Sequence, residues 1–404
     1  MSDTKDLLIL GGGLVGMTLA LAAAKRGFTA HVVDRADPAE LTAEGFDGRA
    51  SAISTASWNL FGNIGLAVTL EPHGCPISSI AVTDQMRPGR IDFQPEEADD
   101  TLGRMFANRV LRQTLFDAAR KEPAIHWHSR AEIVERRRDA FGAAVVLADG
   151  QVLRGSLMIG AEGRASPTRD HAGIAVARWE YDHRAIIAGL VHEKPHEGVA
   201  WEIFYPEGPF ALLPLLDDDK GRHRSALVWT VDEADAEGTL KLSDRAFLAE
   251  ASARMGGMFG AMELAGDRSS WPLGFHHTAR ITSDRLALVG DAGHGIHPIA
   301  GQGFNLGLRD VGALVEVLEE GRRIGLEPGD AQLLKRYEDW RGLDAFSVAL
   351  ATDGLTRLFG LPGRSASAIR RLGMAGVQRA PALKRFFMDE ARGVSGDVPE
   401  LMRG

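Results

Sequence analysis

The stretch LLILGGGLVG, residues 7–16, decides the fold of this chain. Its first four residues form a short apolar run typical of a buried strand, and residues 14–26 have the pattern of a helix. Between them stands Gly11-x-Gly13-x-x-Gly16. In such a turn the first glycine permits the tight bend, the second lets backbone amides approach a pyrophosphate, and the third lets the helix pack on the strand. Residues 7–16 therefore predict a phosphate-binding βα turn.

A second apolar strand, residues 30–33, ends at Asp34, 21 residues after Gly13. A carboxylate at this spacing accepts hydrogen bonds from ribose hydroxyls. Because strand, turn, helix, second strand and carboxylate agree, we predict a Rossmann-type dinucleotide site. This motif alone does not separate FAD from NAD.

The run of residues 7–24 is uncharged and mostly apolar, and is long enough to suggest a membrane helix or a signal peptide. Four glycines interrupt it, at positions 11, 12, 13 and 16, and Lys25 and Arg26 follow it rather than precede it. We therefore expect a strand, a turn and a helix here.

Composition narrows the class of protein. The 404 residues suit two or three structural units, and 45% hydrophobic with 25% charged residues is ordinary for a globular protein. A net charge of −9 argues against a nucleic-acid partner. Cys75 is the only cysteine, so an intrachain disulfide and a four-cysteine metal site are excluded. We expect a cytoplasmic protein.

A second glycine–carboxylate turn lies near residue 290. The apolar residues 286–289 lead into Gly290-Asp291, and a glycine-rich segment, residues 301–307, precedes a helix. A second carboxylate at a strand end suits a second polyol, and a helix amino end stabilises negative charge. Reduced flavin carries such charge at its N1–C2=O edge, so this turn favours FAD over NAD.

The segment 183–231 has the alternation of antiparallel strands, which indicates a second domain. We expect an α/β fold in which residues 1–72, 95–180 and 280–328 form a discontinuous Rossmann-type FAD-binding domain. Residues 73–94 and 181–279 would form a β-rich substrate domain, and residues 329–404 a helical C-terminal region. Five side chains of the β-rich segment could line an apolar pocket or simply pack the sheet: Trp201, Phe204, Tyr205, Phe210 and Leu212.

Both turns, together with Gly160-Ala-Glu162-Gly-x-x-Ser166-x-x-Arg169 and the string from Gly290 to Asp310, resemble the group A flavoprotein aromatic monooxygenases. Within that group the chain is most similar to the ubiquinone-biosynthesis hydroxylases. Two positions depart from the family pattern. Glu162 stands where the family usually has aspartate, and Asp34 where it often has glutamate.

The resemblance implies a tightly but non-covalently bound FAD and a transiently bound NAD(P)H. It implies no catalytic side chain, since the flavin carries the chemistry, and it places Pro298 near the flavin ring. No metal site is expected. His294 and His297 would need a helix to bring their rings together, and the glycines and Pro298 around them favour a loop. The implied FAD contacts are Gly11, Gly13, Gly16, Asp34, Arg49, Arg109, Glu162, Asp291, Gly301, Gln302, Gly303, Phe304 and Asn305.

The implied reaction is NAD(P)H- and O2-dependent hydroxylation of the ring of a polyprenyl phenol or benzoquinol in ubiquinone biosynthesis. Three alternatives stay open: a flavin hydroxylase of a small soluble aromatic compound, a prenyl-chain reductase of the same fold, and a non-catalytic flavin or nucleotide sensor. The hydrophobic aromatic substrate is the partner expected first.

Residues 355–392 are positively charged although the whole chain is negative: they contain eight Lys and Arg residues and two acidic residues. Apolar side chains are interleaved with them, and a basic amphipathic stretch can rest on an anionic membrane surface. A solvated helical face, a contact in a biosynthetic complex or a homo-oligomer contact would have the same pattern. Peripheral association at the inner face of the membrane is therefore a hypothesis.

Overall fold

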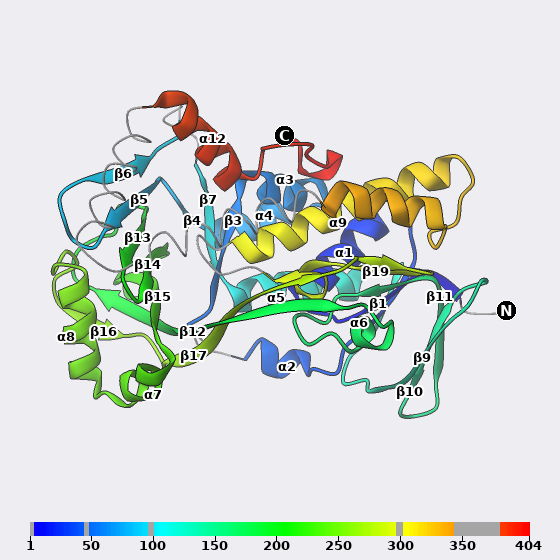
Figure 1. Ribbon diagram of the computed structural model, residues 1–404, viewed down its shortest axis with the longest axis horizontal. Helices are drawn as coiled ribbons and strands as arrows, with labels where there is room; N and C mark the ends of the chain where they lie inside the picture. The colour runs from blue at the N-terminus through cyan, green and yellow to red at the C-terminus, as the bar shows by residue number, and fades with distance from the viewer. Residues whose placement is uncertain (1–3, 44–47, 96–100, 296–301, 343–379) are drawn as a thin grey trace.

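The computed structural model describes residues 4–43, 48–95, 101–295, 302–342 and 380–404. The structure contains two large sheets. Two long strands, β12 (Val176–His192) and β17 (Ser269–Thr278), run across the molecule between them (Figure 1). The α/β class with a Rossmann-type core, expected from the sequence, is confirmed. Within the described ranges, no helix combines the length and the apolar character needed to cross a membrane.

An eight-stranded sheet carries the two glycine turns that the sequence predicts to bind FAD, and it is called the cofactor sheet below. Five of its strands run parallel in the order β19, β11, β1, β2 and β8, while β18 pairs antiparallel with β19, and β10 and β9 extend antiparallel from β11. Parallel order brings the carboxyl ends of β19, β11, β1 and β2 to one edge. The strands are β1 (Thr4–Leu10), β2 (Ala30–Val33), β8 (Ile125–His128), β9 (Ile133–Arg138), β10 (Ala143–Leu147), β11 (Val152–Gly160), β18 (Thr282–Ser283) and β19 (Leu286–Leu288).

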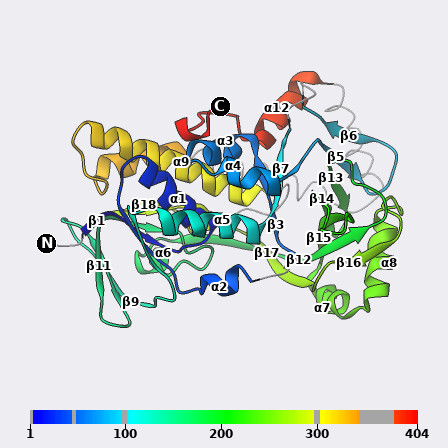
Figure 2. The ribbon, with the colours of Figure 1, turned by 180° about the vertical axis from the view of Figure 1, so that it is seen from behind.

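Three helices cover this sheet: α1 (Leu14–Lys25), α5 (Asn108–Lys121) and α9 (Gln302–Arg323) (Figure 2). Residues 7–10 are fully buried, because a parallel sheet is covered on both faces and its strands are apolar throughout. α1 is apolar almost all round, since it lies between the sheet and α9. The sheet and its helices share one core.

A nine-stranded sheet contains the segment that the sequence predicts to form the substrate domain, and it is called the substrate sheet below. Its strands run in the order β20-β17-β12-β15-β14-β13-β5-β6, with β16 beside β12. All pairs are antiparallel except β13 with β5. The strands are β5 (Ser79–Asp84), β6 (Arg90–Phe93), β12 (Val176–His192), β13 (Val199–Tyr205), β14 (Gly208–Leu215), β15 (His223–Asp232), β16 (Met262–Leu264), β17 (Ser269–Thr278) and β20 (His294–Gly295).

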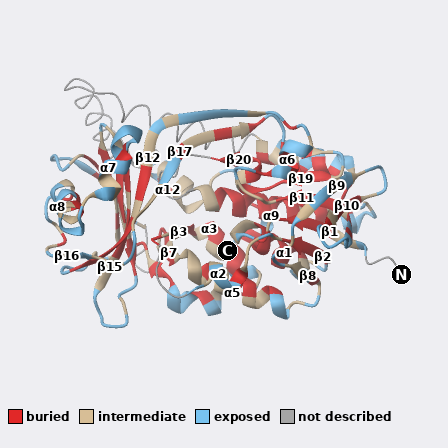
Figure 3. Cartoon of the chain, turned by 90° about the horizontal axis from the view of Figure 1, so that it is seen from below, coloured by how far each residue is buried: buried red, intermediate tan, exposed pale blue. Residues whose placement is uncertain are grey.

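The outer face of this sheet packs under α7 (Glu233–Lys241) and α8 (Asp244–Arg254). Figure 3 shows the two helices at the end of the molecule away from the cofactor sheet. Phe210 and Leu212 are core residues of this layer, and Trp201 and Tyr205 pack against it. These four side chains therefore pack the outer face, and of the five candidate pocket residues only Phe204 alternates to the inner face.

A three-stranded sheet of β3 (Ala50–Ser54), β7 (Gly103–Ala107) and β4 (Cys75–Pro76) lies against the inner face. Cys75, Met105 and their neighbours share a small core with Ala200, Leu215 and Ala226 of the substrate sheet. The remaining elements connect these layers. They are α2 (Pro38–Leu41), α3 (Thr55–Asn63), α4 (Ala67–Leu70), η1 (Glu71–His73), α6 (Pro167–His171), η2 (Gly290–Ala292), α12 (Pro381–Arg392) and η4 (Glu400–Met402).

Candidate functional site

The glycine turn after β1 is built by close backbone contacts. Gly11 has φ +105°, and a Cβ there would lie 2.4 Å from the carbonyl oxygen of Ala161 at the end of β11. A Cβ on Gly16 would lie 1.9 Å from the carbonyl oxygen of Gly11. These two glycines are therefore required by the packing of strand, turn and helix.

Gly13 is different, because no described residue lies within 4 Å of its Cβ position. It is the N-cap of α1, where no side chain caps the helix and no acidic residue lies in the first turn. The first N–H groups of α1 are thus left for another partner, and the helix end favours an anion. The space in front of Gly13 fits a phosphate group.

Asp34 lies beside this turn at the end of β2. Its Oδ2 accepts a hydrogen bond from the Gly12 N–H at 2.5 Å, and its Oδ1 accepts one from the Ala36 N–H at 2.7 Å. A carboxylate has about four acceptor positions, so capacity remains for ribose hydroxyls. The two backbone bonds fix the carboxylate at the sheet edge.

The second turn lies at the same edge, after β19. Gly290 has φ +59°, and Asp291 follows it with a side chain 42% exposed. Arg164 Nε lies 3.4 Å from Asp291 Oδ2, while Arg164 Nη1 donates to the Gly274 carbonyl at 2.9 Å. Asp291 therefore presents a partly free carboxylate, with one arginine beside it.

The amino end of α9 meets both turns. A Cβ on Gly307 would lie 2.9 Å from Val15 and 3.3 Å from Gly290 Cα, so α9 packs closely on the start of α1 and on the second turn. Among the described residues, none lies within 4 Å of the Cβ position of Gly303, and no acidic residue lies in the first turn of α9. A second helix end suited to negative charge is thus placed near the first.

Other residues expected at the cofactor have protein partners. Asn305 Nδ2 donates to the Ala52 carbonyl at 2.9 Å, and its Oδ1 accepts from the Ser54 N–H at 3.0 Å. Asn305 therefore ties α9 to β3. Phe304 is half-buried and packs against the cofactor-sheet core.

Glu162 is held within its own loop. Its carboxylate accepts from Arg136 Nη2 at 3.0 Å, from Ser166 Oγ at 2.8 Å and from the Thr168 N–H at 3.0 Å. These bonds clasp the segment after β11 to α6 and β9. Three of its about four acceptor positions are taken, so at most one remains for a cofactor contact by Glu162.

The two candidate arginines lie close together. The carbonyl of Arg49 accepts from the Asn108 N–H at 3.0 Å, and Arg109 follows in the first turn of α5. The Arg49 guanidinium lies 5.7 Å from the centre of the Trp271 ring. Arg109 is half-buried, and its side chain makes no hydrogen bond or ion pair with the described residues.

Two residues expected at the cofactor, Pro298 and Gly301, lie outside the described residues, as do His297 and the side chain of Gln302. Gln302 itself begins α9.

A buried network around Asp310 supports the second turn. Its Oδ2 accepts from the Gly290 N–H at 2.8 Å and lies 2.8 Å from His294 Nε2, while Arg341 Nε donates to Oδ1 at 2.7 Å. Burial alone would raise the pKa of Asp310, but the charges and hydrogen bonds of His294 and Arg341 outweigh burial and hold this pKa below its usual value.

This network was not among the predicted cofactor residues. The spacing Gly307-x-x-Asp310 was visible in the sequence, but Arg341 carries no local signal, because it reaches Asp310 only through packing. Tyr337, on the same helical segment 331–342, donates to the Leu288 carbonyl at 2.9 Å. Both side chains brace the end of β19.

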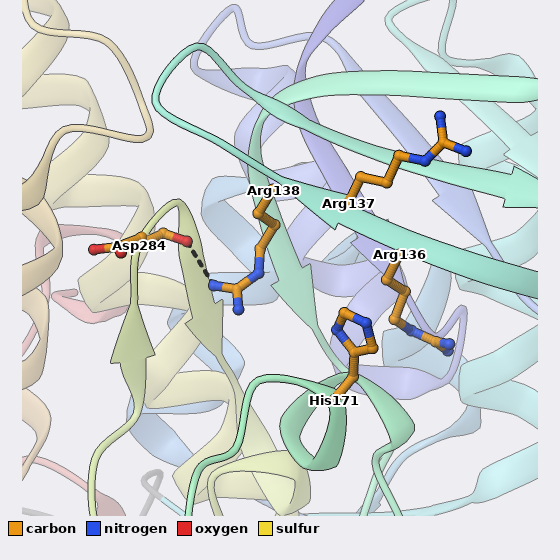
Figure 4. Close-up of a pocket in the computed structure, with 5 residues that line it drawn as sticks. All are labelled: Arg136, Arg137, Arg138, His171 and Asp284. Carbon is orange, nitrogen blue, oxygen red and sulfur yellow. Dashed lines mark hydrogen bonds between the residues drawn. The ribbon is translucent and has the colours of Figure 1, made fainter.

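A separate hollow of about 380 Å³ opens beside β9 and α6 (Figure 4). Arg138 Nη1 donates there to the Asp284 carbonyl at 2.6 Å, and burial lowers the pKa of Arg138. Figure 4 shows His171 and Arg136 on the side opposite Asp284. None of the glycines of the two turns lines this hollow, so it is distinct from the candidate cofactor site.

The geometry of the two turns fits FAD. Two helix ends suited to anions lie near each other, with free space before Gly13 and Gly303. Asp34 and Asp291 stand at one sheet edge, as a ligand with two polyol groups requires.

Comparisons with known proteins agree with this geometry. Residues 4–348 match the family model described as "FAD binding domain". The chain is 42% identical to the ubiquinone hydroxylase UbiL of Rhodospirillum rubrum, covering 99% of this chain and 92% of that protein. It is 33% identical to the 3-demethoxyubiquinol 3-hydroxylase of Escherichia coli, covering 96% and 98%.

Among solved structures, p-nitrophenol 4-monooxygenase PnpA from Pseudomonas putida DLL-E4 superposes with a TM-score of 0.80. The identity is 17%, and 98% of this chain and 99% of that chain are covered. At this identity the likeness shows a shared fold.

Proposed function

The chain belongs to the FAD binding domain family and is an FAD-dependent monooxygenase, and on this premise we propose that it hydroxylates the ring of a polyprenyl phenol or benzoquinol in ubiquinone biosynthesis. The observation that carries the proposal is the 42% identity to a ubiquinone hydroxylase over 99% of the chain. A second relative, 33% identical, is named for the hydroxylation of a demethoxyubiquinol.

In the proposed reaction a ring C–H bond becomes C–OH. One oxygen atom of O2 enters the product and the other leaves as water, while NAD(P)H supplies two electrons and one proton comes from solvent. FAD, when bound, supplies the oxygen activation and the hydroxyl transfer. The protein has to hold the cofactor, orient the ring and keep water out.

The residues that would hold FAD divide by chemistry. The free amino end of α1 at Gly13 would receive the pyrophosphate, helped by the Arg109 guanidinium. Asp34 would accept hydrogen bonds from the ribose, and Asp291 from the ribityl chain. The start of α9 at Gly303 would stabilise negative charge on the flavin ring.

Quinone intermediates in a strain that lacks the gene test the proposal. We expect mass spectrometry to find a prenylated ring that lacks one hydroxyl or its methoxy descendant, and complementation should remove it. A normal quinone profile would favour the small-aromatic hydroxylase instead. Oxygen consumption by the purified holoenzyme separates a hydroxylase from a prenyl-chain reductase, which needs no O2.

We further propose that the basic segment 355–392 docks the enzyme on an anionic membrane, where a polyprenyl substrate resides. Only its last part, α12, lies within the described residues. There Phe386 is 57% exposed, and it follows Lys384 and Arg385. Basic side chains next to an exposed aromatic ring suit the lipid interface.

Co-sedimentation with anionic liposomes tests this docking. Changing Arg370, Arg371, Lys384 and Arg385 to Glu should abolish binding. A control with the same change of charge, at the exposed Lys121, Arg154, Lys220 and Arg245, should still bind. Equal binding by both variants would contradict docking through this segment.

A further inference from the structure

Glu202 is a buried carboxylate in the middle of the substrate sheet. It lies on β13 and is only 7% exposed. Across the sheet its register partners are Val82 on β5 and Ala211 on β14, and the same row continues through Val228 on β15 to Ile187 on β12. A single acidic group thus stands in an otherwise apolar row.

The row faces inward. On β13, Ile203 belongs to the core under α7 and α8, and Trp201 packs against that core, so the alternate residue Glu202 points to the opposite face. Ala200, on the same side as Glu202, packs with the small sheet that contains Cys75 and Met105. In Figure 1 this side looks from the substrate sheet toward the rest of the molecule.

The row also reaches the cofactor side. Ile187 Cγ2 lies 3.3 Å from the Cβ position of Gly48, the neighbour of Arg49. Val82, Val228 and Ile187 are only half-buried, although their strands have neighbours on both sides. This part of the inner face is therefore not sealed by packing.

The Glu202 carboxylate has no hydrogen bond or ion pair in the described part of the chain. Asp310, the other deeply buried carboxylate discussed above, is satisfied by Arg341, His294 and the Gly290 N–H. Its oxygens keep some solvent exposure on the inner face. A carboxylate without a protein partner in an apolar row points to a ligand or a chemical role.

We infer that Glu202 accepts the phenolic hydroxyl of the substrate and acts as its general base during ring hydroxylation. This inference rests on the proposed function. The hydroxyl proton passes to a Glu202 oxygen, and the O–H electron pair stays on the substrate oxygen, which enriches the ortho and para ring carbons. When the hydroxylated ring has lost its carbon-bound proton to solvent, Glu202 returns its own proton to the product oxygen.

The environment of Glu202 suits this role. Burial raises its pKa to about 7, which makes it a stronger base than an ordinary carboxylate and leaves it ionised in mildly alkaline solution. The facing residues of β5, β14, β15 and β12 in its row are apolar. On the same face of β5, Asp84 lies two residues beyond Val82, and no charged group of the described chain shifts the pKa of Glu202.

The test compares wild-type holoenzyme with Glu202→Gln and Glu202→Asp, with 2-geranylphenol and p-cresol as probes. FAD content, read from the flavin absorbance, should be equal in all three and reports that the site is intact. The wild-type kcat should rise with pH through an apparent pKa near 7. Glu202→Gln should lower kcat about 100-fold and remove this pH dependence, and should divert NAD(P)H oxidation to H2O2. Glu202→Asp should restore the pH dependence and part of the rate.

A Glu202→Gln enzyme within threefold of the wild-type kcat, with the same pH profile, overturns the inference. If p-cresol alone is hydroxylated, the prenyl substrate of the proposed function is wrong, and the variants compared on p-cresol still decide the role of Glu202. If wild type hydroxylates neither phenol, both proposals fall.

Discussion

Glu202 makes the stability of the folded enzyme depend on pH in a predictable direction. Burial raises its pKa from 4.5 to about 7. Below pH 4.5 the group is protonated in both the folded and the unfolded chain. Between pH 4.5 and 7 only the unfolded chain ionises, so the folded state loses stability as the pH rises, and above pH 7 the loss is complete. At 1.36 kcal/mol per pH unit this amounts to about 3 kcal/mol.

Glu202→Gln removes this titration while keeping the size of the side chain. At about 2.1 cal/mol/K of unfolding entropy per residue, 3 kcal/mol corresponds to about 4 °C in melting temperature for a chain of 404 residues. We expect the melting temperature of Glu202→Gln, relative to wild type, to rise by about this amount between pH 5 and pH 8. The exposed Glu250→Gln serves as the control. A Glu202→Gln difference that stays constant over this range would refute the buried, unpartnered state.

Three further predictions concern the rest of the chain. Gly13→Val should fold but yield colourless protein, because its side chain enters the open space before the turn; absorbance near 450 nm checks this. Gly16→Ala should lower the yield of soluble protein, because its Cβ would lie 1.9 Å from the Gly11 carbonyl oxygen. Asp310→Ala should cost about 3–5 kcal/mol in denaturant unfolding, because Arg341 is left buried without its carboxylate. Cys75, whose pKa burial raises to about 11, should resist iodoacetamide at pH 8 until the protein is unfolded.

The cofactor turn could be predicted from sequence because its determinants are local. Gly11, Gly13, Gly16 and Asp34 act within one βαβ unit, and their spacing follows from the geometry of that unit. The second turn was predictable for the same reason, since strand, Gly290 and Asp291 are consecutive.

Side-chain partners across the chain could not be predicted. Asn305 bonds to β3, some 250 residues earlier, and Arg341 reaches Asp310 from another helix. No periodicity reports such contacts, because they depend on how finished elements pack. Glu162 likewise has a family-like position, but Arg136, Ser166 and Thr168 occupy its carboxylate.

The alternation of β13 predicted two faces without saying which face looks inward. That choice depends on α7 and α8, which follow β15 and cover Ile203 and Phe210. Because these helices pack on the apolar, aromatic face of β13 and β14, the opposite face, which carries Glu202, points to the interior of the molecule. The larger aromatic side chains of β13 and β14 therefore pack the outer face, and they do not mark the inner face, where we propose that the substrate binds.

Contacts made by the backbone and contacts made by side chains place different demands on the sequence, which explains how this fold is shared with PnpA at 17% identity. In the proposed site, backbone groups and helix ends would hold the cofactor. Such contacts tolerate changes in most side chains as long as Gly11 and Gly16 permit the close backbone contacts. On our proposal, substrate specificity would lie in the row of side chains on the inner face of the nine-stranded sheet that contains Glu202. A row that is apolar from Val82 to Ile187 except at Glu202 suits a ligand that is apolar except at one hydroxyl, and a prenylated phenol has that character. The same row would bind a uniformly polar aromatic acid poorly, because its carboxylate would meet apolar side chains or the charge of Glu202.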